Sequence, residues 1–183
     1  MIHAPLNNGD DMFAGRFRMD YERQNEAGVS TYYLQTCVPG FDPLHFITRE
    51  GVIMRPASLL HDYDEGSVPR GICQGFVSPN AFGRAYAMHD MAYPARGWWE
   101  LRGWTLWFNV DTGQWEAKGG TWVYVPKTRH EADSMLIRWA MADGCGRDEA
   151  YEMFEGVLLG GGGIWEAHAG PFPELPFIEG DVP

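Results

Sequence analysis

Cysteine, basic residues and long apolar runs are all scarce in this sequence of 183 residues. Its three cysteines, Cys37, Cys73 and Cys145, are widely spaced and form no C-x-x-C pair. That pattern argues against a disulfide framework and against a thiolate zinc site. No apolar stretch approaches the roughly 18–20 residues that a transmembrane helix needs, so no membrane span is expected. The first ten residues lack the basic and apolar regions of a signal peptide, and we therefore expect no export signal.

Positive charge is also in short supply, because 14 Lys and Arg residues stand against 25 Asp and Glu residues, for a net charge of −11. A basic surface that follows a nucleic-acid backbone is improbable with this balance, so nucleic acid is not an expected partner. The length is close to the usual size of about 150 residues for one domain. We expect a single α+β domain over residues 1–160 and an extended, acidic Gly/Pro-rich tail over residues 161–183.

Short β-type runs dominate the first third of the chain, and Gly- and Pro-containing turns separate them. They predict a small N-terminal antiparallel sheet. The runs cover residues 17–21, 29–37, 45–48 and 52–54. Residues 57–81 show no usable period and contain an acidic stretch at 61–66, so an ordered loop is expected there.

Three helices are predicted after this region. The pair Ser78-Pro79 favours the start of the first helix, and Pro94 is expected to end it. A capping box from Thr128 to Glu131 begins the second helix, which closes at Gly144. The third covers about residues 147–159, where apolar residues recur at helical spacing and form an amphipathic stripe.

Tryptophan is concentrated between the first two helices, with six of the eight residues at positions 98–122. Alternating runs at 104–110 and 122–125, with turns at 111–113 and 118–120, predict a Trp-rich β-wing. Tryptophan suits half-wet surfaces such as lipid interfaces and protein contacts. Candidates for partner binding are therefore Trp98, Trp99, Trp104 and Trp107. The alternative is that these rings pack the core or hold the wing to the helices.

The chemistry of the sequence centres on His89 and Asp133, which both fall on inward faces of their predicted helices. A buried carboxylate needs a partner, and an imidazole on the facing helix would supply one. Such a pair can act as a general base. Asp90, beside the histidine, could then bind a hard cation such as Ca²⁺ together with Asp64 of the acidic stretch, and that cation would polarise an ester carbonyl. The alternative is a structural polar pair.

Three runs in a fixed order, at residues 64–70, 83–93 and 129–133, resemble the family catalogued as domain of unknown function 1353, which is common in tailed phages and prophages. The family's pattern is D-G-A-S-x-P-R, then H-D-x-x-Y, then R-x-E-A-D. The resemblance implies a virion component of a phage tail or tail tip, made in the bacterial cytoplasm, with other virion proteins as partners.

The H-D-x-x-Y and A-D motifs are also similar to those of phospholipase A2, especially its viral capsid form. This likeness implies that His89 is the general base, Asp133 orients it, Tyr93 donates a supporting hydrogen bond and Asp90 holds Ca²⁺. The implied substrate is a phospholipid ester or another component of the cell envelope.

Two other interpretations stay open. His61, His89, Asp90 and Asp133 also fit the metal-ligand set of HD-type phosphohydrolases, although those proteins are all-helical and the first third of this chain predicts strands. The chain can also be a non-catalytic structural protein of a phage tail, in which the His-Asp pair clamps the core.

Overall fold

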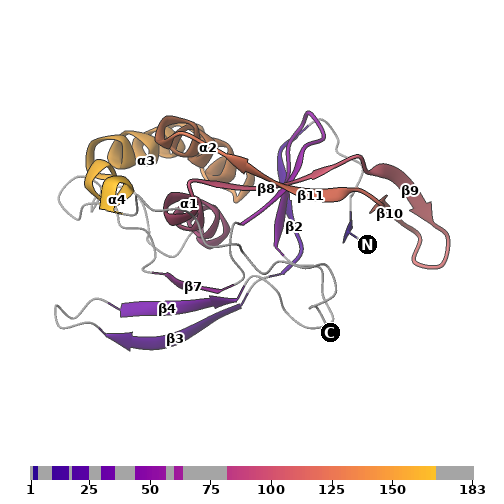
Figure 1. The fold of residues 1–183 in the computed structure, drawn as a ribbon, viewed down its shortest axis with the longest axis horizontal. Helices are drawn as coiled ribbons and strands as arrows, with labels where there is room; N and C mark the ends of the chain where they lie inside the picture. The colour runs from indigo at the N-terminus through magenta and orange to yellow at the C-terminus, as the bar shows by residue number, and fades with distance from the viewer. Residues whose placement is uncertain are drawn as a thin grey trace.

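The computed structural model describes residues 2–3, 10–16, 18–24, 30–35, 44–56, 60–63 and 82–167. These residues form an α+β fold, as the sequence predicts. The helices gather at one end, and a β-hairpin projects from the other (Figure 1). Within the described residues, every helix is too short or too polar to cross a membrane.

A five-stranded antiparallel sheet forms the middle of the molecule, with the strand order β11-β8-β6-β5-β2. Its strands come from two distant parts of the chain. They are β2 (Met12–Ala14), β5 (His45–Ile47), β6 (Ile53–Arg55), β8 (Gly97–Arg102) and β11 (Thr121–Pro126). The pairing of Ile53 with Leu101 joins the two parts.

The predicted N-terminal sheet is thus divided in the structure. Of the predicted strands, β3 (Arg18–Gln24) and β4 (Ser30–Gln35) are separate from the central sheet and form a three-stranded sheet with β7 (Leu60–Tyr63). The expected loop at 57–81 therefore contains a strand at its start, and residues 64–81 lie outside the described residues. Local alternation identifies strands but not their partners, which is why the division was missed.

The Trp-rich wing is confirmed as β-structure, but it has two parts. Strands β8 and β11 belong to the central sheet, while β9 (Thr105–Asn109) and β10 (Gln114–Lys118) form the projecting hairpin. We call residues 105–118 the hairpin arm. The short strand β1 (Ile2–His3) pairs with β10 on the arm's inner edge.

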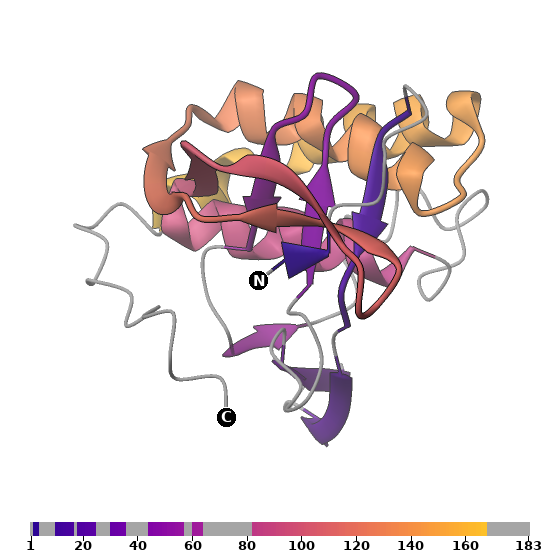
Figure 2. The ribbon, with the colours of Figure 1, turned by 90° about the vertical axis from the view of Figure 1, so that its right-hand side faces the viewer.

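The described residues form three longer helices, α1 (Gly83–Ala95), α2 (Arg129–Ala142) and α3 (Arg147–Gly160). Of these, α1 and α2 contact the central sheet and α3 packs against α2; Figure 2 shows the helices behind the strands. The capping box of Thr128 and Glu131 is present as predicted. The prediction that Pro94 ends α1 is wrong. The helix continues through Pro94 to Ala95, and its C-cap residue, Arg96, adopts a left-handed conformation.

The predicted tail also differs from expectation at its start. Residues 162–167 form a short helix, α4 (Gly162–Ala167), which contacts α1 and α3. Residues 168–183 lie outside the described residues. The glycines at 160–163 had indicated only the end of the third helix, so the sequence offered no sign of the helix that follows.

The two faces of the central sheet cover two separate apolar clusters, because successive side chains of a strand point to opposite sides. Phe46, Met54 and Trp98 face the helices, where the ring of Trp139 lies edge-on to Phe46 at 6.5 Å and to Trp98 at 5.5 Å. Ile47, Ile53 and Leu101 form the second cluster on the other face. The first cluster holds α1 against α2 and so determines the geometry of the site.

Candidate active site

His89 and Asp133 face each other across the contact between α1 and α2, as predicted. The imidazole Nε2 lies 3.2 Å from Asp133 Oδ1. His89 is 5% exposed and Asp133 is 0% exposed. An ionised carboxylate can only accept, so Nε2 carries the proton and donates to Oδ1. The second ring nitrogen, Nδ1, therefore keeps its lone pair in the neutral imidazole.

Tyr93 joins the pair from the next turn of α1. Its hydroxyl donates to the same oxygen, Asp133 Oδ1, over 2.5 Å. The rings of Tyr93 and His89 also stack at a tilt, with centroids 4.5 Å apart. The H-D-x-x-Y spacing thus places both donors one helical turn apart, so that one carboxylate oxygen receives two hydrogen bonds.

Arg129 approaches the other carboxylate oxygen from within α2. Its Nε lies 3.3 Å from Asp133 Oδ2, an ion pair at i, i+4 spacing. Its Nη2 donates to the carbonyl oxygens of Val157 at 2.9 Å and Leu158 at 2.5 Å, at the C-terminal end of α3. The carboxylate of Asp133 is therefore held on both oxygens, by α1 on one and by its own helix on the other.

Asp90 lies on the opposite side of the imidazole. Its Oδ1 is 3.5 Å from His89 Nδ1, at the long limit of hydrogen-bond distance. The Asp90 side chain is partly exposed, whereas Asp133 is fully enclosed. Nε2 of the His89 ring thus faces the buried carboxylate of Asp133, and Nδ1 faces the partly exposed carboxylate of Asp90.

The two carboxylates control the protonation of the ring. Burial of the imidazole acts to lower the pKa of His89, but the hydrogen bonds and negative charges of Asp133 and Asp90 outweigh it, so the pKa is raised above 6.5. Burial acts to raise the pKa of Asp133, yet the bonds from His89 and Tyr93 and the charge of Arg129 lower it overall. Burial and the Asp133 carboxylate raise the pKa of Tyr93. Asp133 is thus ionised, and Tyr93 is a neutral donor.

The structure describes only one of the two residues expected to bind calcium. Asp64 lies outside the described residues, and Asp90 contributes one carboxylate. Among the side chains that the structure describes, no three His, Cys, Asp or Glu residues gather into a metal-binding group. Calcium takes 6–8 oxygen ligands, so the described residues do not fit a calcium site by themselves. His61, the additional ligand of the phosphohydrolase interpretation, belongs to β7, which runs beside α1.

The four tryptophans expected at an interface mostly contact this chain's own residues. Trp98 is buried in the core, so it is not an interface residue. The ring of Trp99 lies edge-on to Tyr124 at 5.7 Å. Trp104 packs against the second cluster, and Lys118 Nζ lies 4.8 Å from the ring centre of Trp107.

The exposed apolar surface of the hairpin arm consists of other residues. Leu106 and Phe108 are each 42% exposed, and Val110 in the turn is 76% exposed. Residues 106 and 108 point to the same face of β9, with Trp115 beside Phe108 across the hairpin. The alternating pattern predicted strands here, but only the packing shows which face is open.

Sequence reasoning missed Arg129 as a site residue. An Arg-Asp pair at i, i+4 on one helix is visible in the sequence, and that spacing could have identified it. Its carbonyl partners in α3 had no sequence signal, because any residue can supply a main-chain oxygen.

Comparisons of the chain with protein-family models, with curated proteins and with solved structures found no match. The resemblances to the phage-associated family and to phospholipase A2 therefore rest on their motifs, and function is inferred from the geometry of the site.

Proposed function

We propose that this chain is an ester hydrolase in which His89 acts as the general base, Asp133 orients the imidazole and Tyr93 supports the carboxylate. The observation that carries this proposal is the placement of the two ring nitrogens. Nε2 is bound to buried Asp133, and Nδ1 lies beside partly exposed Asp90. A base must be held by one nitrogen and be free to accept a proton at the other.

The proposed reaction is hydrolysis of a carboxylic ester by water. Nδ1 takes a proton from the water while its oxygen forms a bond to the ester carbonyl carbon. The resulting tetrahedral intermediate collapses, the bond to the alcohol oxygen breaks, and the imidazolium returns the proton to that oxygen. Asp133 stays ionised throughout and stabilises the imidazolium. The products are a carboxylic acid and an alcohol.

The substrate class that we favour is a phospholipid or another ester of the cell envelope. Support comes from the order of the motifs, H-D-x-x-Y on α1 and A-D on α2, and from the geometry that they produce. The arm adds an exposed apolar surface, Leu106, Phe108 and Val110, that suits contact with lipid or a neighbouring protein.

The proposed place of the protein is the tail of a phage particle, with other virion proteins as partners at the hairpin arm. This rests on the ordered triple of motifs and on the projecting arm (Figure 1). Immunodetection in purified particles tests the placement. The double variant Leu106→Ser/Phe108→Ser should fold but enter particles less efficiently, whereas normal incorporation would remove the arm as the partner surface.

The hydrolase proposal is tested by fatty-acid release from phospholipid vesicles. The parent protein should release fatty acid, and His89→Asn should release none above background. His130→Asn is the matched control, because His130 is an exposed histidine of α2 whose ring packs only edge-on near Phe154. Parallel assays with added Ca²⁺ and with a chelator test whether a cation takes part.

A second candidate function is a structural core clamp without catalysis. The observation that favours it is the enclosure of Asp133, which has no exposed surface and three partners from α1 and α2. Hydrolysis by neither the parent nor the control, together with lower stability of His89→Asn, would assign the pair to this role.

A further inference from the structure

The corner between α3 and α4, formed by Gly161 and Gly162, lies against two residues of the candidate site, Tyr93 and Arg129. Gly161 has φ −76° and ψ −9°, which any residue can adopt, so its backbone does not require glycine. The requirement comes from the neighbours. A Cβ placed on Gly161 would overlap Tyr93 Oη and would lie 2.8 Å from the Val157 carbonyl oxygen. Only glycine lets the chain pass this close to the tyrosine hydroxyl.

The next residues of the corner reach the other support of Asp133. A Cβ on Gly162 would lie 3.0 Å from Arg129 Nη1. The ring of Trp165 on α4 stands edge-on to Tyr93, with centroids 5.1 Å apart. The same turn of α3 provides the carbonyl groups that bind Arg129. The corner thus contacts both residues that hold the Asp133 carboxylate, Tyr93 at Oδ1 and Arg129 at Oδ2.

We propose that the corner formed by Gly161 and Gly162 is a positioning element of the His89–Asp133 site: it holds the Tyr93 hydroxyl and the Arg129 guanidinium against the two oxygens of Asp133. The corner has no role in the chemistry itself. It acts through Tyr93 and Arg129 on Asp133, and through Asp133 on the imidazole. The expected effect of the corner on hydrolysis rests on the proposed function, whereas its expected effect on the NMR signals of the His89 ring does not.

Such a support matters because both hydrogen bonds to the Asp133 carboxylate end on the same oxygen, Oδ1. His89 and Tyr93 both donate to Oδ1, and Arg129 pairs with Oδ2 without a well-aligned hydrogen bond. A small rotation of the carboxylate would lengthen the bond to Nε2 and release the ring. Displacements of about 1 Å at a catalytic group lower rates by about 100-fold.

The test compares Gly161→Ala with Gly163→Ala. Gly163 is the matched control, because a Cβ there would meet no atom within 4 Å and alanine suits α4 better than glycine. The first readout is the ring ¹⁵N and ¹³C shifts of His89 at one pH, assigned by their loss in His89→Asn. The second is fatty-acid release. Gly161→Ala should shift the ring signals toward a mixture of tautomers and lower kcat by about 10–100-fold.

A double variant separates the contact with Tyr93 from general damage. Tyr93→Phe removes the hydroxyl that the new Cβ would meet, while the contact with the Val157 carbonyl stays the same in both backgrounds. Adding Gly161→Ala to Tyr93→Phe should therefore change the ring shifts and kcat less than it does in the parent. If Gly161→Ala alone fails to fold, the double variant should recover the fold.

Unchanged ring shifts in folded Gly161→Ala overturn the inference, as do equal effects of Gly161→Ala and Gly163→Ala or strictly additive effects in the double variant. A double variant that also fails to fold overturns it too. The parent protein can also prove to release no fatty acid while Gly161→Ala still alters the ring shifts. That result supports the positioning role of the corner and rejects the hydrolase proposal.

Discussion

The Tyr93 hydroxyl donates a hydrogen bond of 2.5 Å to Asp133 Oδ1, the same oxygen that accepts from His89 one helical turn earlier in α1. The bond reaches a buried charge, so its loss leaves part of that charge unsatisfied. We predict that Tyr93→Phe lowers the free energy of unfolding by about 1–3 kcal/mol, measured by urea denaturation. Tyr151→Phe on the exposed side of α3 is the control and should leave it unchanged. Equal stabilities of the two variants would contradict the prediction.

Removal of the Asp133 carboxylate should be more damaging than loss of the tyrosine hydroxyl. Asp133→Ala leaves the Arg129 guanidinium and the His89 ring without their buried partner. Breaking one side of a buried ion pair costs about 3–5 kcal/mol, and we predict a loss of that size. Thermal and urea unfolding measure it, beside Asp111→Ala in the exposed turn of the arm. A loss no greater than that of the control would mean that Asp133 is not a structural centre.

Stability should depend on pH through His89. Burial of the ring opposes protonation, but Asp133 and Asp90 outweigh burial and raise its pKa above 6.5 in the folded state. The folded protein then binds the proton more tightly than the unfolded chain does. The stabilisation is fully present below pH 6.5 and is lost as pH rises through the folded pKa. Urea denaturation from pH 6 to pH 9 should show this fall, and His89→Asn should flatten it.

Activity should change with pH in the opposite direction. The general base works in its neutral form, so fatty-acid release should rise as pH increases through the raised pKa of His89. The pH that favours catalysis is thus the pH that removes the histidine's contribution to stability. A rate that falls over the same range would exclude His89 as the base.

A further prediction concerns the start of α1, which has no capping side chain of its own. Asp143, at the end of α2, accepts from the backbone N–H groups of Arg84 at 2.9 Å and Ala85 at 3.2 Å, and it pairs with Arg84 Nε at 2.5 Å. Loss of a helix cap costs about 0.5–2 kcal/mol, and Asp143→Ala should fall in that range.

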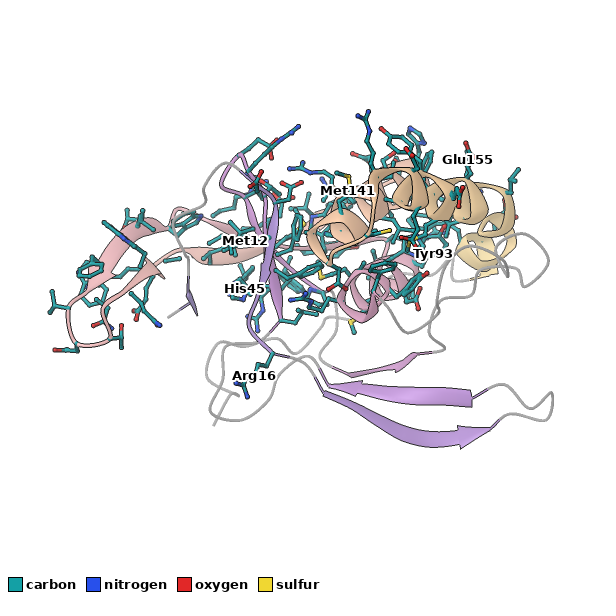
Figure 3. The ribbon with its side chains drawn as sticks, turned by 180° about the vertical axis from the view of Figure 1, so that it is seen from behind. Met12, Arg16, His45, Tyr93, Met141 and Glu155 are labelled. Carbon is teal, nitrogen blue, oxygen red and sulfur yellow. The ribbon has the colours of Figure 1, made fainter. Side chains whose placement is uncertain are left out.

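Hydrogen exchange locates the effect of this change. Amides in the first turn of α1 should exchange faster in Asp143→Ala than in the parent, while those of α3 should not change. Glu155→Ala on the outer face of α3 (Figure 3) is the control and should have no effect at α1. Uniformly faster exchange in all helices would show a global loss of stability rather than loss of a cap.

The parts of the fold that were predictable from the sequence depend on local signals. The capping box at Thr128 and the stripe of the third helix define α2 and α3 through neighbours within one or two turns. His89 and Asp133 were recognisable because each breaks the apolar face of its own helix. Two polar residues on facing apolar surfaces can satisfy each other only if they meet.

The remaining features depend on contacts between distant segments. Alternation predicts that Ile53 lies in a strand but does not show that it pairs with Leu101. Asp143 caps a helix that begins 60 residues earlier in the chain, and its own surroundings in the sequence do not indicate this. Gly161 looks like an ordinary helix end, because its close neighbour Tyr93 belongs to another helix.

The separation of His89 from Asp133 by 44 positions also has a consequence for biosynthesis. On the ribosome, the nascent chain carries the imidazole long before it carries the carboxylate that holds Nε2. Between the two lie β8 and β11, which complete the central sheet, and α2 follows them. A chain released early, before α2, would have a histidine without its orienting partner. Under the proposed function, hydrolytic activity would thus require a chain that extends through α2, and shorter translation fragments would lack it.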